Sequence, residues 1–137
     1  MSARNVEIVR SILAAWELGD VDAMALLIAE DGELVPLRAQ LEGTSYRGPE
    51  GLRRFWADLN ADWEDLRLPI GEARALGDRV LVIGRLIARG RTSGVELDVP
   101  IGQLWELRDG LVVRMKAFSD PDEALRAAGF SEGSGQE

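Results

Sequence analysis

The chain of 137 residues contains neither cysteine nor histidine. Without cysteine it has no disulfide, no thiolate nucleophile and no sulfur-ligated metal. Without histidine it has no Ser-His-Asp triad and no ordinary zinc site. Acid–base chemistry is therefore left to carboxylates, arginine, the single lysine Lys116, the single tyrosine Tyr46 or bound water. We expect neither a metal nor any other cofactor.

Positive charge is scarce. The 16 basic residues are outnumbered by 24 acidic ones, and the net charge is −8. An acidic domain repels a phosphate backbone, and no run of basic residues compensates. Nucleic acid is therefore not an expected partner.

Long hydrophobic runs are also missing. No apolar stretch approaches the ~20 residues that a membrane helix needs, and the first residues lack the apolar core of a signal peptide. We therefore expect a cytoplasmic protein with no membrane partner. The length fits one domain over residues 1–130, followed by a small, polar and flexible tail at 131–137.

The first half of the chain has helical periodicity. An apolar stripe at spacings of three and four residues predicts a helix over 5–18, and Gly19 suits its C-cap. Asp20 is placed to cap a second helix that ends near residues 30–32. A short strand at 33–37 contains Pro36, which restricts it to a sheet edge or bulge. Residues 38–46 have the composition of a loop, and Gly48-Pro49-Glu50 begins a third helix.

The second half alternates like strands. We expect strands at 66–76, 79–91, 95–107 and 111–118, with hairpin turns at Gly77-Asp78 and Asp109-Gly110. Asp120 then caps a last helix that Gly129 ends. Hairpins this short leave no room for parallel crossovers, so a Rossmann arrangement is disfavoured. The expected fold class is α+β.

Four segments carry a family resemblance. They are LAAWELGDVDAM at 13–24, YRGPEGL at 46–52, WELRDGLVV at 105–113 and FSDP at 118–121. In this order they resemble the nuclear transport factor 2-like superfamily, and within it the SnoaL-like cyclases and ketosteroid-isomerase-like proteins. The resemblance implies a cone-shaped, curved antiparallel sheet wrapped around three helices of the N-terminal half, plus a short C-terminal helix. It also implies an apolar ligand pocket and a homodimer packed through the outer sheet face.

Two enzyme classes of this fold fit the residues poorly. Alignment on Gly19-Asp20 places Pro36, Ile12 and Gly102 where a ketosteroid isomerase needs its aspartate base, tyrosine and protonated aspartate. That mechanism is therefore rejected. An epoxide-hydrolase-like reading matches Asp120 and an arginine at Arg85, but the carboxylate partner of that arginine is missing, so the motif is incomplete.

A SnoaL-like cyclase moves a proton with an aspartate, and Asp98 and Asp120 are the candidates. For Asp120 the sequence favours a second explanation, that of a plain helix cap. Asp98 alternates with Leu97, Val99 and Ile101, so it points away from whichever face buries those three. Superposition on the family instead turns Asp98 inward and leaves the three apolar residues outside. Both assignments stay open.

The candidate pocket residues are Trp16, Tyr46, Phe55, Trp56, Met115 and Arg85. Aromatic residues at helical spacing also fit a plain core, and Arg38 and Arg85 either meet an acidic ligand or pair with surface carboxylates. The leading hypothesis is a homodimeric protein that binds a small apolar, polyketide- or terpenoid-like molecule, with proton transfer by a carboxylate left undecided. The alternatives are a non-catalytic dimeric binding or interaction module and the epoxide hydrolase-like enzyme.

Overall fold

The computed structural model describes residues 2–129, so the predicted tail at 131–137 lies outside the described residues. The elements follow one another as α1 (Ser2–Leu18), α2 (Val21–Ala25), β1 (Ile28–Val35), α3 (Leu37–Glu42), β2 (Tyr46–Arg47), α4 (Gly48–Asp62), β3 (Trp63–Arg67), β4 (Ile70–Leu76), β5 (Arg79–Gly90), β6 (Glu96–Arg108), β7 (Leu111–Phe118) and α5 (Pro121–Ala127). No helix among them is long and apolar enough to cross a membrane.

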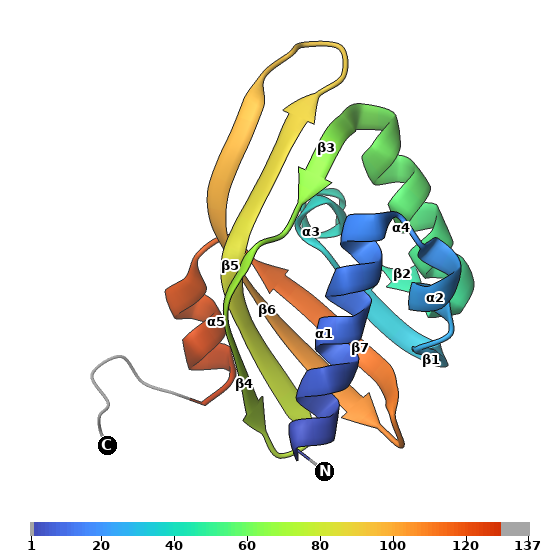
Figure 1. Cartoon of the computed structure of the whole chain (residues 1–137), viewed down its shortest axis with the longest axis vertical. Coiled ribbons are helices and arrows are strands. Elements are labelled where there is room, and N and C mark those ends of the chain that lie inside the picture. Colours follow the sequence, from blue (N-terminus) through green and yellow to red (C-terminus); the bar gives the residue numbers. More distant parts are fainter. Residues whose placement is uncertain (1, 130–137) are drawn as a thin grey trace.

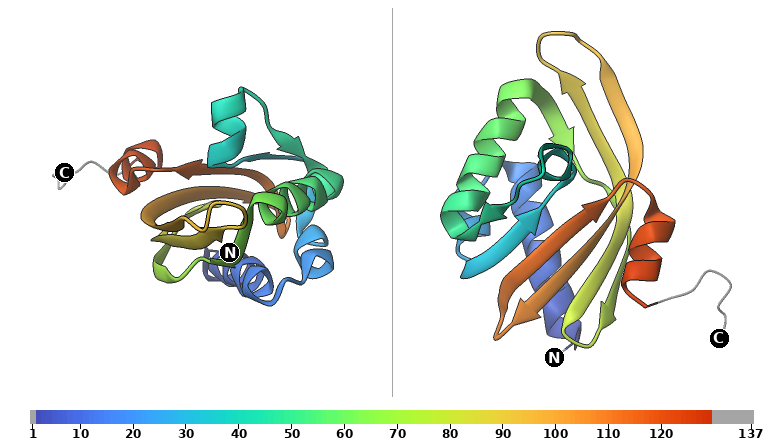
Figure 2. Two further views of the ribbon diagram at one scale, coloured as in Figure 1. Left: turned by 90° about the horizontal axis from the view of Figure 1, so that it is seen from above. Right: turned by 180° about the vertical axis from the view of Figure 1, so that it is seen from behind.

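The strands form one curled sheet in the order β2-β1-β7-β6-β5-β3, with β4 also paired to β5. Each pairing is antiparallel except that of β1 with β7, which is parallel. Helices α1 and α4 lie on one side of the sheet (Figure 1), and the view from behind shows α5 on the other side (Figure 2). The predicted α+β cone is confirmed.

The N-terminal half differs from the prediction in two places. The second helix ends at Ala25 instead of near residue 30, because residues from Ile28 onward pair with β7 as strand β1. The expected loop at 38–46 contains α3, which Gly43 ends in a left-handed conformation with φ of 69°. The described N-terminal half therefore has four helices, two of them short, instead of three.

The second half agrees closely with the predicted strands. The last strand has the predicted bounds, Leu111–Phe118. The hairpin before it turns at Asp109 and Gly110, both with positive φ, as the tight turn that joins two twisted strands requires. The strand predicted at 66–76 is two strands, β3 and β4, which pair with different parts of β5.

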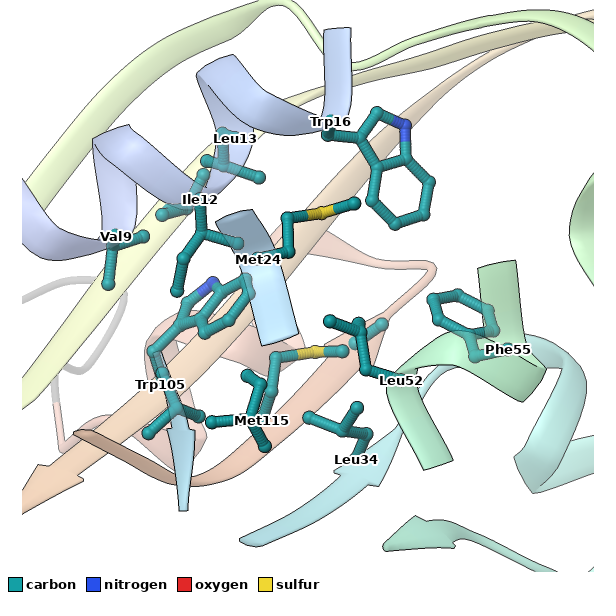
Figure 3. Close-up of a cluster of buried hydrophobic side chains, with 14 of the residues drawn as sticks. Val9, Ile12, Leu13, Trp16, Met24, Leu34, Leu52, Phe55, Trp105 and Met115 are labelled. Atoms are coloured by element: carbon teal, nitrogen blue, oxygen red, sulfur yellow. The ribbon is translucent and has the colours of Figure 1, made fainter. Parts of the chain in front are cut away.

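Side chains along β6 alternate between two apolar layers. Ile101, Gln103 and Trp105 face the concave side and line one cavity there. Figure 3 shows Trp105 in one cluster with Ile12 of α1 and Leu52 of α4. Leu104 faces the convex side and packs with Leu81 and with residues of α5. The main core therefore lies inside the cone, and α5 covers a smaller core outside it.

Candidate ligand cavity

The main core is not completely filled. A cavity of about 90 Å³ remains between the concave sheet face and helices α1 and α4. This volume is enough for several water molecules or for part of a small ligand. Of the described residues that line it, only Arg38 and Gln103 carry a polar side chain apart from the indole nitrogens of Trp16 and Trp105.

One wall of the cavity is aromatic. The Trp16 and Phe55 rings lie 5.7 Å apart, and both residues line the cavity together with Met115. Trp56 packs edge-on against Trp16 at 4.9 Å, and Tyr46 packs against Phe55 at 5.3 Å. Trp56 and Tyr46 do not line the cavity; they support the two rings that do.

The open end of the cavity lies near α3. The lining residues that keep partial exposure are Leu37, Arg38, Leu59 and Leu86, from α3, α4 and β5. The remaining walls come from buried residues of α1, α2, α4, β1, β6 and β7 and of the segments that follow β1 and β3. A ligand would therefore enter beside α3.

Arg38 lies at this opening. Its Nη1 donates to the carbonyl oxygen of Asp58 and to Oδ2 of Asp62, each at 3.3 Å. Its Nε is buried and has no hydrogen-bond partner among residues 2–129. One side of the guanidinium is thus held by α4, while the Nε donor is left unpaired.

Gln103 is the buried polar residue of the inner face, with 7% of its surface exposed. Its Oε1 accepts a hydrogen bond from Nε1 of Trp105 at 3.1 Å. Because an indole nitrogen only donates, the atom of the Gln103 amide that contacts Trp105 must be the oxygen. The amide nitrogen of Gln103 is therefore left for another partner. Within the described chain, that nitrogen donates no hydrogen bond.

Tyr46 and Asp58 form a pair behind the aromatic wall. The Tyr46 hydroxyl donates to Oδ2 of Asp58 at 2.7 Å. Burial raises the pKa of Tyr46, and the hydrogen bond to Asp58 and the charge of that carboxylate raise it further, while Arg38 lowers it. Tyr46 therefore stays protonated well into the alkaline range and acts as a hydrogen-bond donor.

Arg85 and Asp98 lie away from the cavity, on the convex face. Nε of Arg85 donates to Oδ1 of Asp98 at 2.6 Å, and both side chains are more than half exposed. Asp98 thus points opposite to Ile101, which lines the cavity. This ion pair joins β5 to β6 across the outer surface.

Asp120 also lies outside the cavity. It is the N-cap of α5, where Oδ1 accepts a hydrogen bond from the backbone nitrogen of Asp122 at 3.0 Å. None of the described residues that line the cavity is an aspartate or glutamate. The described residues also hold no group of three or more acidic side chains suited to a metal.

Sequence reasoning missed Gln103 because it had placed its neighbour, Gly102, at the pocket position. In the structure a Cβ at Gly102 would meet the Ala124 Cβ at 2.5 Å, so this glycine faces α5. The signal was present in the strand alternation, since Gln103 is the polar member of the series from Leu97 to Trp105 on one face. No pattern in the sequence indicates the unpaired Nε of Arg38, because it depends on contacts between α3 and α4.

A family model described as the SnoaL-like domain matches residues 9–115. Three solved structures illustrate the similarity. A protein with a ketosteroid isomerase-like fold from Catenulispora acidiphila, in complex with trimethylamine, is 24% identical with a TM-score of 0.74, covering 90% of this chain and 92% of that chain. TerC, co-crystallised with polyporic acid, is 23% identical with a TM-score of 0.76, covering 91% and 98%. A protein provisionally described as a SnoaL-like polyketide cyclase from Jannaschia sp. CCS1 is 25% identical with a TM-score of 0.76, covering 93% and 92%. No curated protein matches the chain.

Proposed function

We propose, from the premise that this chain belongs to the SnoaL-like domain family, that it binds a small, largely apolar molecule in the cavity of the cone. The observation that carries the proposal is the composition of the walls, which are apolar except for Arg38, Gln103 and the indole nitrogens. Ligand pockets typically combine such walls with a few polar groups that orient the ligand.

A flat ring compound of polyketide or terpenoid type suits these walls best. Trp16 and Phe55 present aromatic surface to the cavity, and Met115 adds a flexible apolar side chain. Proteins of the same fold were crystallised with polyporic acid and with trimethylamine. Those ligands belong to the other proteins, but they support a small-molecule role for this chain.

Binding without proton transfer is the form of this function that the geometry supports best. Asp98 is ion-paired on the convex face, and Asp120 caps α5. A carboxylate that moves a proton must come within hydrogen-bond reach of the substrate. A proton-transfer role for either aspartate would require the ligand to bind outside this cavity. The epoxide hydrolase-like alternative finds no support here either, since Arg85 and its partner Asp98 both lie outside the cavity.

A substitution at the opening tests the proposed site. Leu86 and Ile87 are neighbours on β5, but only Leu86 lines the cavity. We expect Leu86→Trp to weaken binding of the neutral ring compound 2-acetonaphthone at least about ten-fold by filling the entrance, whereas Ile87→Trp leaves binding unchanged. Isothermal calorimetry on both variants and the wild type measures the effect. Equal binding by the two variants would place the ligand elsewhere.

The homodimer through the outer sheet face and the cytoplasmic location remain parts of the proposal. Helix α5 covers one region of the convex face, and the Arg85–Asp98 pair occupies another. Sedimentation equilibrium on the wild type measures the oligomeric state. A monomer at high protein concentration would remove the dimer from the proposal without affecting the cavity.

A further inference from the structure

The polar groups along the cavity that lack a partner are all hydrogen-bond donors. Nε1 of Trp16 and Nε of Arg38 are the buried side-chain nitrogens left without an acceptor in the described part of the chain. The amide nitrogen of Gln103 also has no acceptor among the described residues, but it is not one of the fully buried unpaired atoms. These three groups belong to α1, α3 and β6, which meet at one cavity.

An unpaired buried donor is unfavourable, because it has given up its hydrogen bonds to water and gained none in return. A few such groups in one structure call for an explanation. Here all three residues line the same cavity, and no acceptor side chain lines it except the oxygen of Gln103 that is already engaged. An acceptor brought by the ligand would satisfy the amide nitrogen of Gln103, which is the one of the three nitrogens that keeps accessible surface.

Arg38 adds charge to this preference. The Asp62 carboxylate that pairs with it is 61% exposed, so water screens that partner strongly. Arg38 lines the cavity, and no described lining residue is a carboxylate, so its positive charge favours a negative charge on a ligand. A cationic ligand, by contrast, would find no carboxylate among the described lining residues and a positive neighbour in Arg38.

We infer that the cavity is selective for apolar ring compounds that carry an acidic oxygen, a carboxylate or an ionised enol or phenol. The inference rests on the proposed function and specifies its ligand class. The ring occupies the apolar part of the cavity, and the acidic oxygen accepts from Gln103 and Arg38. The net charge of −8 opposes the approach of an anion, so the selectivity comes from these local donors and not from the overall field.

The test compares two ring compounds of nearly equal shape, 2-naphthoate and the neutral 2-acetonaphthone. Hydrogen bonds to charged groups are the strongest of their kind, so we expect the wild type to bind the acid at least about ten-fold more tightly than the ketone. Quenching of tryptophan fluorescence measures both affinities, since Trp16 and Trp105 line the cavity.

Gln103→Glu is the most informative variant. It keeps an oxygen for the Trp105 indole, removes the amide donor and adds a negative charge at nearly the same volume. We expect it to lower the affinity for 2-naphthoate at least about ten-fold while the affinity for 2-acetonaphthone changes less than about three-fold. An unchanged preference for the acid would overturn the inference.

Arg38→Leu provides a second, independent test if the Gln103 variant does not fold. Arg85→Leu is the matched control, because it removes the same charge from the convex face. We expect only Arg38→Leu to lose the preference for the acid. Equal losses in both variants would show that overall charge, and not the cavity, selects the acid.

The outcomes separate the two proposals. If the wild type binds the ketone as tightly as the acid, the inference fails and the apolar binding site stands. If it binds neither compound, the proposed function fails and the inference fails with it.

Discussion

Tyr46 is the single tyrosine of the chain, and its buried hydroxyl donates to Asp58. The pKa of this phenol is raised above its ordinary value of 10.0, chiefly by burial and then by the carboxylate of Asp58. The folded state therefore binds the phenolic proton more tightly than the unfolded state. The resulting stabilisation is complete below pH 10.0 and is lost as the pH rises through the raised pKa.

This pair predicts the alkaline stability of the protein. The free energy of unfolding of the wild type should fall with pH above 10.0, and Tyr46→Phe should show a shallower fall. At neutral pH the variant should be less stable by about 1 kcal/mol, because the hydrogen bond to Asp58 is lost. Urea unfolding at several pH values measures both effects, and phenolate absorbance follows Tyr46 directly. If the free energy of unfolding fell equally steeply with pH in the wild type and in Tyr46→Phe, the prediction would be contradicted.

The residue scale also shows why position within a strand decides chemistry. Asp98, Gly102 and Gln103 lie close together on β6, yet only Gln103 faces the cavity. A shift of one residue in the alignment exchanges the two faces of a strand. The expected pocket position therefore fell on Gly102, which faces α5.

At the scale of elements, α5 packs closely on the convex face of β6. Gly102 leaves room for the methyl group of Ala124, which would lie only 2.5 Å from a Cβ at this position. Gly71, on β4, has its nearest such neighbour at 3.5 Å, an ordinary contact. The absence of a side chain at Gly102 therefore sets how near α5 approaches the sheet.

Gly102→Ala should lower the free energy of unfolding by about 1–3 kcal/mol, because a backbone-borne methyl group cannot move aside. The double variant Gly102→Ala/Ala124→Gly should lose less free energy of unfolding than the two single variants lose together. The Ala124→Gly change by itself costs about 1 kcal/mol, because glycine is unfavourable within a helix. Chemical denaturation of the variants measures the coupling, with Gly71→Ala as the control. Additive effects of the two changes would show that this contact does not limit the packing.

At the scale of the whole molecule, two long helices pack against a curled sheet (Figure 2), and a cavity remains between them. A ligand that fills this space binds the folded state and not the unfolded chain. It therefore stabilises the fold by mass action. The thermal midpoint is then a measure of cavity occupancy that needs no reaction to be known.

A ligand at about one hundred times its Kd should stabilise the folded state by about 2.7 kcal/mol, which raises the Tm by roughly 5–10 °C for a domain of this size. We expect this rise for the wild type with 2-naphthoate, and a much smaller one for Leu86→Trp at the same concentration. Differential scanning calorimetry measures the shift. A Tm that stays constant at saturating ligand would contradict binding to the folded state.

The local sequence determined the elements whose signals lie within a few residues. The turn at Asp109-Gly110, the cap at Asp120 and the stripe of α1 are set by backbone preference and periodicity, so these could be predicted. The sequence also indicated part of the aromatic wall, since Trp16 and Phe55 lie on the apolar faces of helices, and such faces are expected to be buried. The family resemblance supplied the cone, which the family match and the solved structures then confirmed.

Only the tertiary structure decided the features that depend on distant partners. Residues 28–32 belong to a strand that pairs with β7, although their local pattern favoured the end of a helix. The amide oxygen of Gln103 accepts from Trp105, which leaves the amide nitrogen without a partner, and Nε of Arg38 is unpaired while α4 engages Nη1 of the same guanidinium. A local pattern reports which side chains are to be buried, whereas the partner that each buried polar atom finds is set by contacts between segments far apart in the chain.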